Sequence, residues 1–418
     1  MNSNHTPLWT SDAAMQATGG ITPSTWQVSG VSIDSRTLEP GDLFVAIAGP
    51  VHDGHQFLAS AFSAGASAAL VQASHLRQTD RARFADKLLI VDDSLQALGR
   101  LTQAARQRTA AKVIAVTGSV GKTGTKEMLR LVLSEQGETT ATAGNLNNHY
   151  GLPLSLARLP QQAAYGVFEL GMSAAGEILP LTRMTRPHVA LITTIESAHS
   201  EFFKSIEDIS DAKAEIFAGL EPAGIAILNG DNPMFERLSQ RATEAGVGDI
   251  RVFGAAVRAD CRLLDVQAIS GGSRVNVDLR GKQISFEISV PGRHWVQNAL
   301  GVLCAVEALG ADPEIAAARL AGMAGIEGRG RHHILSISGG SAVLIDESYN
   351  ASPASMKAAL EVLGEMAVPD QGRKIAVLGD MLELGAGADS LHAGLADVLI
   401  DKGIDLVFTT GQHMAALR

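Results

Sequence analysis

Cysteine, long apolar runs and excess positive charge are all scarce in this 418-residue chain. The two cysteines, Cys261 and Cys304, do not have the spacing of metal ligands, which predicts free thiols in a reducing compartment. No stretch approaches the roughly 18 continuous apolar residues that cross a bilayer, and the first thirty residues lack the basic start and apolar run of a signal peptide. These absences predict a cytoplasmic protein without integral membrane association.

A net charge of −10 and a pI near 5.6 argue against a nucleic-acid partner. Any anionic ligand must therefore be bound by basic residues that are clustered locally. The composition is 46% hydrophobic and 19% charged, which is typical of a globular protein, and the length favours two or three domains. No solenoid repeat or low-complexity tract is present, and we expect a monomer.

The most informative stretch combines a strand, a glycine turn and a helix. Residues 113–116 are apolar and mostly β-branched, Gly118 and Gly121 mark the turn, and a helical pattern follows to residue 133. In this layout backbone N–H groups and the helix N-terminus face an anion. Lys122 adds a point charge, and the Thr123 hydroxyl can hold Mg²⁺. The stretch therefore predicts a site for nucleotide phosphates.

The strict pattern G-x-x-x-x-G-K-[ST] is not met, because Val116 stands where its first glycine belongs. A chance Gly-Lys-Thr in a surface turn is the alternative, but the flanking strand and helix favour the phosphate site. The strand at 165–171 carries Glu169 near its carboxyl end. A carboxylate there is well placed for Mg²⁺, and a structural strand-end glutamate is the alternative.

Residues 1–110 have the pattern of a small α/β unit, with strands expected at 41–49, 68–71 and 87–91 and a helix from Ser94. Two polar clusters, Asp34-Ser-Arg36 and His52-Asp-Gly-His55, lie at the mouths of its loops. Ordinary turn chemistry explains them as well as ligand binding does.

The middle of the chain, residues 111–325, alternates strands with helices. A strand at 188–194 precedes His199, and a helix at 209–220 holds Lys213, for which a solvated charged face is the simpler explanation. Residues 251–290 alternate apolar and polar positions, which predicts antiparallel hairpins at one sheet edge. In the helix that follows, His294 and Asn298 lie four apart on one face.

Residues 326–418 contain three expected strands, at 342–346, 374–380 and 405–410, with a helix capped by Ser352 or Ser355. They predict a doubly wound parallel sheet that is thin and apparently truncated. The expected fold class is therefore α/β in three domains. A central P-loop mononucleotide-binding domain (111–325) is flanked by a small N-terminal domain (1–110) and an incomplete Rossmann-like C-terminal domain (326–418).

The chain resembles the Mur ligase family in strings spread over all three expected domains. The phosphate turn by itself indicates only that family. Three further strings resemble the branch that joins D-alanyl-D-alanine to UDP-N-acetylmuramoyl-tripeptide, namely Gly-Asn-Leu-Asn-Asn at 144–148, Asp-Glu-Ser-Tyr-Asn-Ala at 346–351 and Gly-Asp-Met-Leu-Glu-Leu-Gly at 379–385. Shared segments elsewhere are Asp34-Ser-Arg, Lys213 within Ala-Lys-Ala-Glu-Ile-Phe, Gly292-Arg-His and Gly328-Arg.

The resemblance implies an ATP-dependent, ADP-forming peptide ligase that works through an acyl phosphate in the last cytoplasmic step towards the peptidoglycan precursor UDP-N-acetylmuramoyl-pentapeptide. By position, the implied catalytic residues are Lys122, Glu169, His199 and Lys213. The implied Mg²⁺ ligands are Thr123, Glu169, His199 and Lys213, the last as a carbamate formed with CO₂. ATP would be bound by Thr117, Gly118, Ser119, Val120, Gly121, Lys122, Thr123, Gly124, His294, Asn298, Arg329 and Asp346. The other substrates would meet Ser35, Arg36, Asn147, Asn148 and Asn350.

Gly124 departs from the family, which often has serine or threonine there, and this predicts a looser helix start. One alternative function is a related ligase with another amine substrate, of the Mur or folylpolyglutamate type. A P-loop kinase or motor NTPase is a second, but no strand ends in its usual apolar run plus aspartate. A catalytically silent binding module is a third, disfavoured by the joint presence of Lys122, Glu169, His199 and Lys213.

Overall fold

The computed structural model describes residues 6–49, 51–197, 201–338, 340–368 and 372–417. The chain forms two compact units. The first comprises Met1–Val113, Glu138–Phe168 and Met184–Arg186, and the second comprises Ile114–Gly137, Glu169–Arg183 and Pro187–Arg418.

The first unit is built on a parallel sheet whose strands follow the order of the sequence. These strands are β3 (Gly30–Ser32), β4 (Asp42–Val45), β5 (Ala68–Gln72) and β6 (Leu88–Val91). Their short apolar runs are buried almost throughout, as expected for parallel strands covered on both faces. The three strands expected from the sequence in this region are thereby confirmed as β4, β5 and β6.

Helices complete the first unit. They are α1 (Ser11–Thr18), α2 (Leu58–Ser63), α3 (Gln78–Phe84), α4 (Ser94–Arg108) and α6 (Gly151–Ala157). The Asp93 side chain accepts a hydrogen bond from the Gln96 N–H and so caps α4, which begins at Ser94 as expected. The remaining strands are β1 (Trp9–Thr10), paired antiparallel with β2 (Gln27–Val28), and β8 (Thr139–Ala141), paired parallel with β9 (Tyr165–Glu169).

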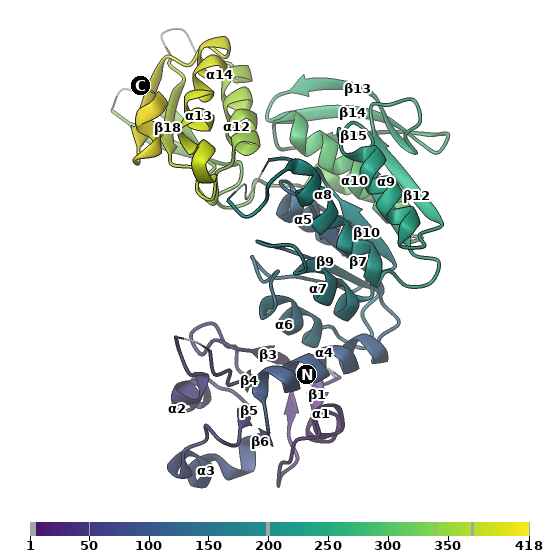
Figure 1. The fold of residues 1–418 in the computed structure, drawn as a ribbon, viewed down its shortest axis with the longest axis vertical. Coiled ribbons are helices and arrows are strands. Elements are labelled where there is room, and N and C mark those ends of the chain that lie inside the picture. The colour runs from purple at the N-terminus through teal and green to yellow at the C-terminus, as the bar shows by residue number, and fades with distance from the viewer. Residues whose placement is uncertain (1–5, 50, 198–200, 339, 369–371, 418) are drawn as a thin grey trace. The chain divides into compact units, whose positions relative to one another are not determined.

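Helix α6 is held to the rest of the first unit by side chains that donate to backbone carbonyls. The Thr102 hydroxyl in α4 donates to Pro153 O at 2.8 Å, and the Trp9 indole donates to Ala157 O at 2.9 Å. Since these donors are buried, their hydrogen bonds satisfy groups that water cannot reach. Figure 1 shows α4 and α6 side by side.

The largest sheet of the described residues has the strand order β15-β14-β13-β12-β11-β10-β7-β9-β8. Four of its strands are parallel neighbours: β7 (Lys112–Thr117), β10 (Val189–Ile192), β11 (Ile225–Asn229) and β12 (Asp249–Gly254). The edge is antiparallel, with β13 (Cys261–Ile269), β14 (Gly272–Leu279) and β15 (Lys282–Ile288). The predicted hairpins are thus confirmed from Cys261 onwards, whereas β12 pairs in parallel with β11.

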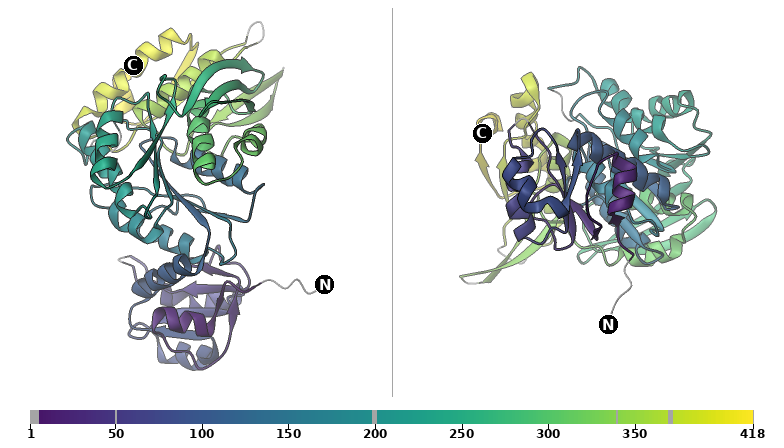
Figure 2. Two further views of the ribbon diagram at one scale, coloured as in Figure 1. Left: turned by 90° about the vertical axis from the view of Figure 1, so that its right-hand side faces the viewer. Right: turned by 90° about the horizontal axis from the view of Figure 1, so that it is seen from below.

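Helices lie on both faces of this sheet (Figure 2). They are α5 (Lys122–Leu133), α7 (Ile178–Thr185), α8 (Ile206–Ala214), α9 (Phe235–Glu244), α10 (Arg293–Ala308) and α11 (Pro313–Leu320). Alternation of parallel strands with helices brings the carboxyl ends of β7, β9 and β10 to the side where ligands bind in such sheets.

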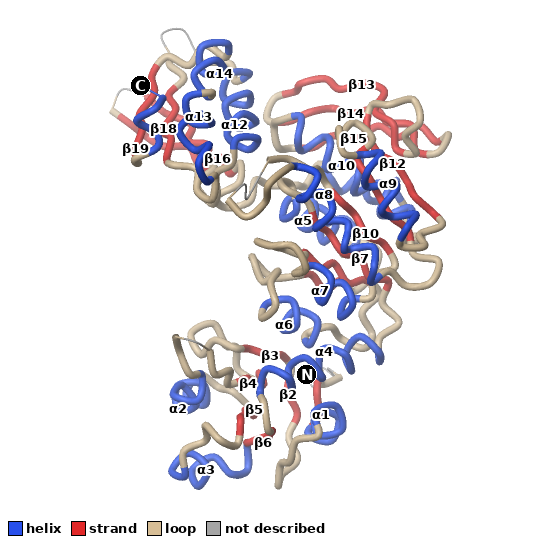
Figure 3. The backbone as a smooth tube through the Cα atoms, in the orientation of Figure 1, coloured by secondary structure: helices blue, strands red, loops and turns tan. Residues whose placement is uncertain are grey.

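The C-terminal part of the second unit contains two separate two-stranded sheets, marked in Figure 3. Strand β16 (Arg331–Ile337) pairs antiparallel with β17 (Gly340–Asp346), and β18 (Ile375–Gly379) pairs parallel with β19 (Leu406–Thr410). The prediction of one sheet containing all three expected strands is therefore wrong. Residues 331–337 form an unforeseen strand, and its antiparallel pairing gives β17 a partner that is near in the sequence.

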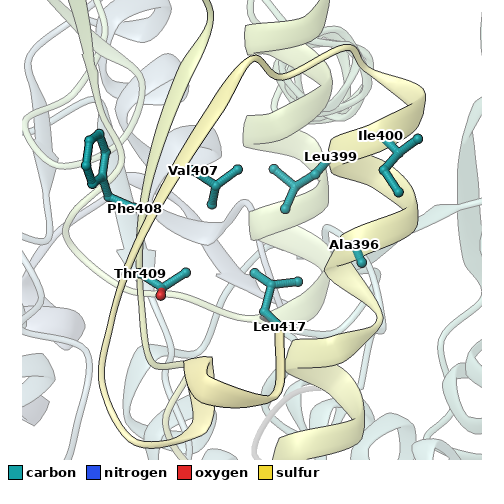
Figure 4. Close-up of a pocket in the computed structure, with 7 residues that line it drawn as sticks. All are labelled: Ala396, Leu399, Ile400, Val407, Phe408, Thr409 and Leu417. Carbon is teal, nitrogen blue, oxygen red and sulfur yellow. The ribbon is translucent and has the colours of Figure 1, made fainter.

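Three helices, α12 (Pro353–Glu365), α13 (Ala388–Ala393) and α14 (Leu395–Asp401), pack on β18 and β19 around a small apolar core. Ser352 caps α12 through a reciprocal pair of hydrogen bonds with Ser355, so the first of the two cap candidates is confirmed. A hollow on α14 and β19 is lined by Ala396, Leu399, Ile400, Val407, Phe408, Thr409 and Leu417 (Figure 4). It carries no ionisable group.

Among the described residues, no helix is both long enough and apolar enough to span a bilayer.

Candidate active site

The loop between β7 and α5 forms a tight cradle at the carboxyl end of the sheet. Gly118 has a φ of +149°, and a Cβ on it would lie 1.9 Å from Thr193 Oγ1, so only glycine fits against the end of β10. The Thr193 hydroxyl donates to Val120 O at 2.6 Å, and the Ser119 N–H donates to Thr194 O at 2.9 Å. The loop is thereby fixed before any ligand arrives.

Lys122 is the first residue of α5, and its side chain curls back over the loop. Its Nζ donates to Gly118 O at 2.8 Å and to Ser119 O at 3.3 Å. Burial lowers the pKa of the lysine; the charge of Glu169 acts in the opposite sense, and that of Arg329 lowers the pKa further. An anion in the cradle would favour the ammonium form and replace the carbonyls as its partner.

Thr123 and Glu169 bring two oxygen ligands together from separate elements. The Thr123 hydroxyl donates to Glu169 Oε2 at 3.0 Å. Glu169 ends β9 and is only 2% exposed. A hydroxyl and a buried carboxylate beside a phosphate loop form the oxygen donor set that Mg²⁺ prefers.

Lys213 lies in α8 and is 2% exposed. Burial, followed by the charge of Lys122, holds the pKa of Lys213 well below its usual range. A lowered pKa favours the neutral amine, which has the lone pair that attack on CO₂ requires. His199, the other implied ligand, lies outside the described residues.

The start of α10 also borders the cradle. A Cβ on Gly121 would lie 2.8 Å from Asn298 Oδ1, which places the carboxamide directly beside the phosphate loop. His294 lies one turn earlier, and burial lowers its pKa to about 4. An amide and a neutral imidazole are suitable partners for the edge and face of a nucleotide base.

Comparison with known proteins decides the family. Three family models match in succession, described as the Mur ligase family catalytic domain (residues 27–106), the Mur ligase middle domain (116–306) and the Mur ligase glutamate ligase domain (330–418). The UDP-N-acetylmuramoyl-tripeptide--D-alanyl-D-alanine ligase of Rickettsia prowazekii is 35% identical over 97% of this chain and 88% of its own length.

This chain belongs to the Mur ligase family.

Solved structures agree with that assignment. A crystal structure of MurF from Acinetobacter baumannii superposes with a TM-score of 0.84 at 32% identity, over 98% of this chain and 87% of that one. MurF ligase from Thermotoga maritima in complex with ADP gives 0.76 at 27% identity, over 93% and 86%. The α/β fold expected from the sequence is thus confirmed.

Arg329 is held beside this Mur ligase cradle by the turn that precedes β16. Its guanidinium lies 4.1 Å from the centre of the Tyr349 ring, a cation–π contact. Asp346 accepts hydrogen bonds from the Gly328 N–H at 2.9 Å and from the Ser348 hydroxyl at 2.6 Å. Asp346 therefore shapes the turn that carries Arg329.

The residues expected to meet the other substrates include four in the first unit. Arg36 is exposed and donates from Nε to Asp34 Oδ1 at 2.9 Å. Asn148 Oδ1 accepts from the N–H groups of Tyr150 and Gly151, so this amide also fixes the start of α6. Ser35 and Asn147 are half-buried, and Asn350 in the second unit is exposed.

One His-rich cluster of the first unit has the composition of a metal site. Asp53, His55 and His75 place ligand atoms within 4.8 Å of one another. However, His55 Nε2 accepts from the Gln72 N–H at 2.8 Å, so its proton lies on Nδ1, 2.6 Å from Asp53 Oδ1. Since both ring nitrogens are occupied, the arrangement favours a structural hydrogen-bond chain over metal ligation.

Sequence reasoning missed several residues that build the cradle. Thr193 and Thr194 end the expected strand 188–194, and that position at a strand's carboxyl end was the available signal. Trp295 gave no signal beyond its place in the expected helix. Gly124, expected to loosen the helix start, is instead buried against the Trp295 ring.

His294 provides a test of the electrostatics. Its pKa is lower in the folded than in the unfolded state, so folding releases protons and stability falls as pH drops from about 6.5 towards 4. The unfolding free energy of the wild type should therefore fall between pH 7 and pH 4.5. In His294→Phe we expect this fall to be smaller by about 1–3 kcal/mol. Denaturant melts across that range measure it. The exposed residue His149, changed to Phe, is the control, and equal pH slopes for the two variants would contradict the assignment.

Proposed function

We propose that this chain joins D-alanyl-D-alanine to UDP-N-acetylmuramoyl-tripeptide, with conversion of ATP to ADP and phosphate. The observation that carries the proposal is a relative of that name, 35% identical over 97% of the chain, together with the phosphate cradle described above. The product would be UDP-N-acetylmuramoyl-pentapeptide, a peptidoglycan precursor, made in the cytoplasm.

In this proposal ATP occupies the cradle. The backbone from Thr117 to Gly124 and the Lys122 ammonium bind the phosphates, because a helix N-terminus with free N–H groups favours an anion. Asn298 and His294 bind the base, and Arg329 binds the phosphates from the opposite side. Asp346 would bind the ribose. Its carboxylate oxygens already accept hydrogen bonds from Gly328 and Ser348, and the ribose would use the acceptor capacity that remains.

Thr123 and Glu169 would hold Mg²⁺, and Lys213, as a carbamate, and His199 would hold a second ion. The oxygen pair at 3.0 Å and the buried Lys213 amine with its lowered pKa support this assignment. Carbamylation replaces an amine by an anionic oxygen ligand, which explains how a lysine could serve a metal. When bound, the ions would offset the charge of the reacting anions.

The proposed chemistry begins with the substrate carboxylate, which is a poor electrophile. Its oxygen attacks the γ-phosphorus of ATP, the bond to ADP breaks, and an acyl phosphate forms. The free amine of D-alanyl-D-alanine then attacks the acyl carbon, loses a proton and expels phosphate. Lys122 and Arg329 serve these steps by offsetting the repulsion between two anions.

The expected domains of 1–110, 111–325 and 326–418 remain part of the proposal, supported by the three successive family matches. The N-terminal domain would bind the UDP-sugar through Ser35 and Arg36. Asn147, Asn148 and Asn350 would approach the reacting end of the peptide. We also propose that the chain acts as a monomer.

Phosphate release from ATP tests the function. With UDP-N-acetylmuramoyl-tripeptide as acceptor, we expect D-alanyl-D-alanine to stimulate release far more than single amino acids do, with formation of the pentapeptide detected by mass spectrometry. The closest alternative is a ligase of the same family with another amine substrate. Stimulation by meso-diaminopimelate on the dipeptide-stage acceptor, with none by D-alanyl-D-alanine, would establish that alternative.

A further inference from the structure

A tryptophan lies directly on the helix that carries Lys122 and Thr123. Gly124 is buried in the first turn of α5, and a Cβ on it would lie 2.8 Å from Cζ3 and 3.1 Å from Cη2 of Trp295. Real Cβ atoms essentially never come within 3.0 Å of another heavy atom. The ring is 4% exposed, so it has little room to retreat.

The glycine is explained by this contact and not by backbone conformation. Gly124 lies inside α5 and is not among the positive-φ residues. Glycine in a helix interior is less stable than alanine. A close approach of the Trp295 ring is therefore the physical reason that accounts for Gly124.

The same ring reaches the turn that carries Arg329. A Cβ on Gly330 would lie 3.6 Å from Trp295 Nε1 and 3.5 Å from Glu347 Oε1. Trp295 thus contacts the first turn of α5 with one edge and lies beside the Gly328–Gly330 turn with the other. An indole has only two side-chain torsions, so it forms a stiff spacer between them.

The distance between α5 and the Gly328–Gly330 turn matters because each of them carries a cation that would bind the same polyphosphate. Lys122 begins α5, and Arg329 lies one residue before Gly330, with its guanidinium resting on Tyr349. The charge of Arg329 lowers the pKa of Lys122, as expected for two cations that face one site. Misplacement by about 1 Å in such a site can cost on the order of 100-fold in rate.

We propose that Trp295 is a positioning residue that sets the distance between the Lys122–Thr123 turn and Arg329, and so tunes the affinity for the ATP phosphates. The inference rests on the proposed ATP site. Simple core packing is the competing explanation. Packing alone predicts a loss of stability, whereas positioning predicts a selective rise in the KM for ATP and coupling between Gly124 and Trp295.

A double-mutant cycle separates the two explanations. We expect Gly124→Ala to raise the KM for ATP about tenfold or more in the natural background, because its methyl group meets the ring. In a Trp295→Leu background the same change should cost less than about twofold, since no ring remains to be met. Trp295→Leu should itself raise the KM for ATP and leave the KM for the UDP-linked substrate unchanged, and Trp295→Phe should retain most of the affinity.

The control is Gly99→Ala, because Gly99 lies within α4 of the first unit and a Cβ there would have no neighbour within 4 Å. Thermal melts confirm folding of each variant. Equal costs of Gly124→Ala in both backgrounds would overturn the inference. If Gly124→Ala does not fold, Trp295→Leu decides, and an unchanged KM for ATP in that variant would likewise overturn it. The wild-type enzyme is assayed first. If it shows no turnover, the proposed function is contradicted, and the result says nothing against the role of Trp295.

Discussion

Replacing Lys122 with alanine is expected to reduce turnover by at least about 10³-fold, because a positioned cation on a transferring phosphoryl group is among the largest catalytic contributions. The Lys122 ammonium is buried and held 2.8 Å from Gly118 O, so it is already in place when ATP binds. No other lysine lies in the 118–121 loop that could replace it.

The measurement is phosphate release under saturating ATP and acceptor. Lys112→Ala is the matched control, because Lys112 is an exposed lysine at the start of β7, whereas the loop follows the opposite end of that strand. A melting curve close to wild type would show that the Lys122 variant is folded. Near-normal turnover in that folded variant would rule out the assigned cradle.

Removal of CO₂ is expected to lower the turnover rate at least about tenfold, and bicarbonate should restore that rate. The reason is the buried Lys213 amine, because burial and the charge of Lys122 lower its pKa and so favour the neutral form that can become a carbamate. Activity is measured in degassed and in bicarbonate-supplemented buffer, and a carbamate carbon signal is sought by ¹³C NMR after incubation with labelled bicarbonate.

Lys213→Arg is the informative variant here, since it keeps a long basic side chain and has no lysine amine to carbamylate. We expect it to be inactive in both buffers and to show no carbamate signal. An enzyme that works equally well without CO₂, together with an active Lys213→Arg, would mean that the lysine acts without modification.

The parts of the site that sequence alone predicted are those encoded locally. The strand, the turn with Gly118 and Gly121, and the helix from Lys122 lie within about a dozen residues, and their geometry follows from hydrogen bonding between near neighbours. Glu169 was found because the carboxyl ends of parallel strands meet at one edge of a sheet, so a strand-end carboxylate is brought to the loop without further information.

Long-range packing decided the rest. The sequence placed β17 in a parallel sheet, but strand β16 formed beside it, and pairing choices depend on neighbours that a local pattern does not reveal. From the sequence, Gly124 predicted only a looser helix start. The structure explains this glycine by the ring of Trp295, which lies 171 positions further along the chain.

The sequence by itself predicted a phosphate cradle between a buried strand and an amphipathic helix, because the apolar strand, the two turn glycines and the start of the helix all lie within about a dozen residues. Only the tertiary structure decided how that cradle is fixed. Thr193 locks Val120 from another strand, and Trp295 spaces Lys122 from Arg329. These contacts depend on side chains far apart in the chain meeting at close-packed distances, which no local pattern specifies.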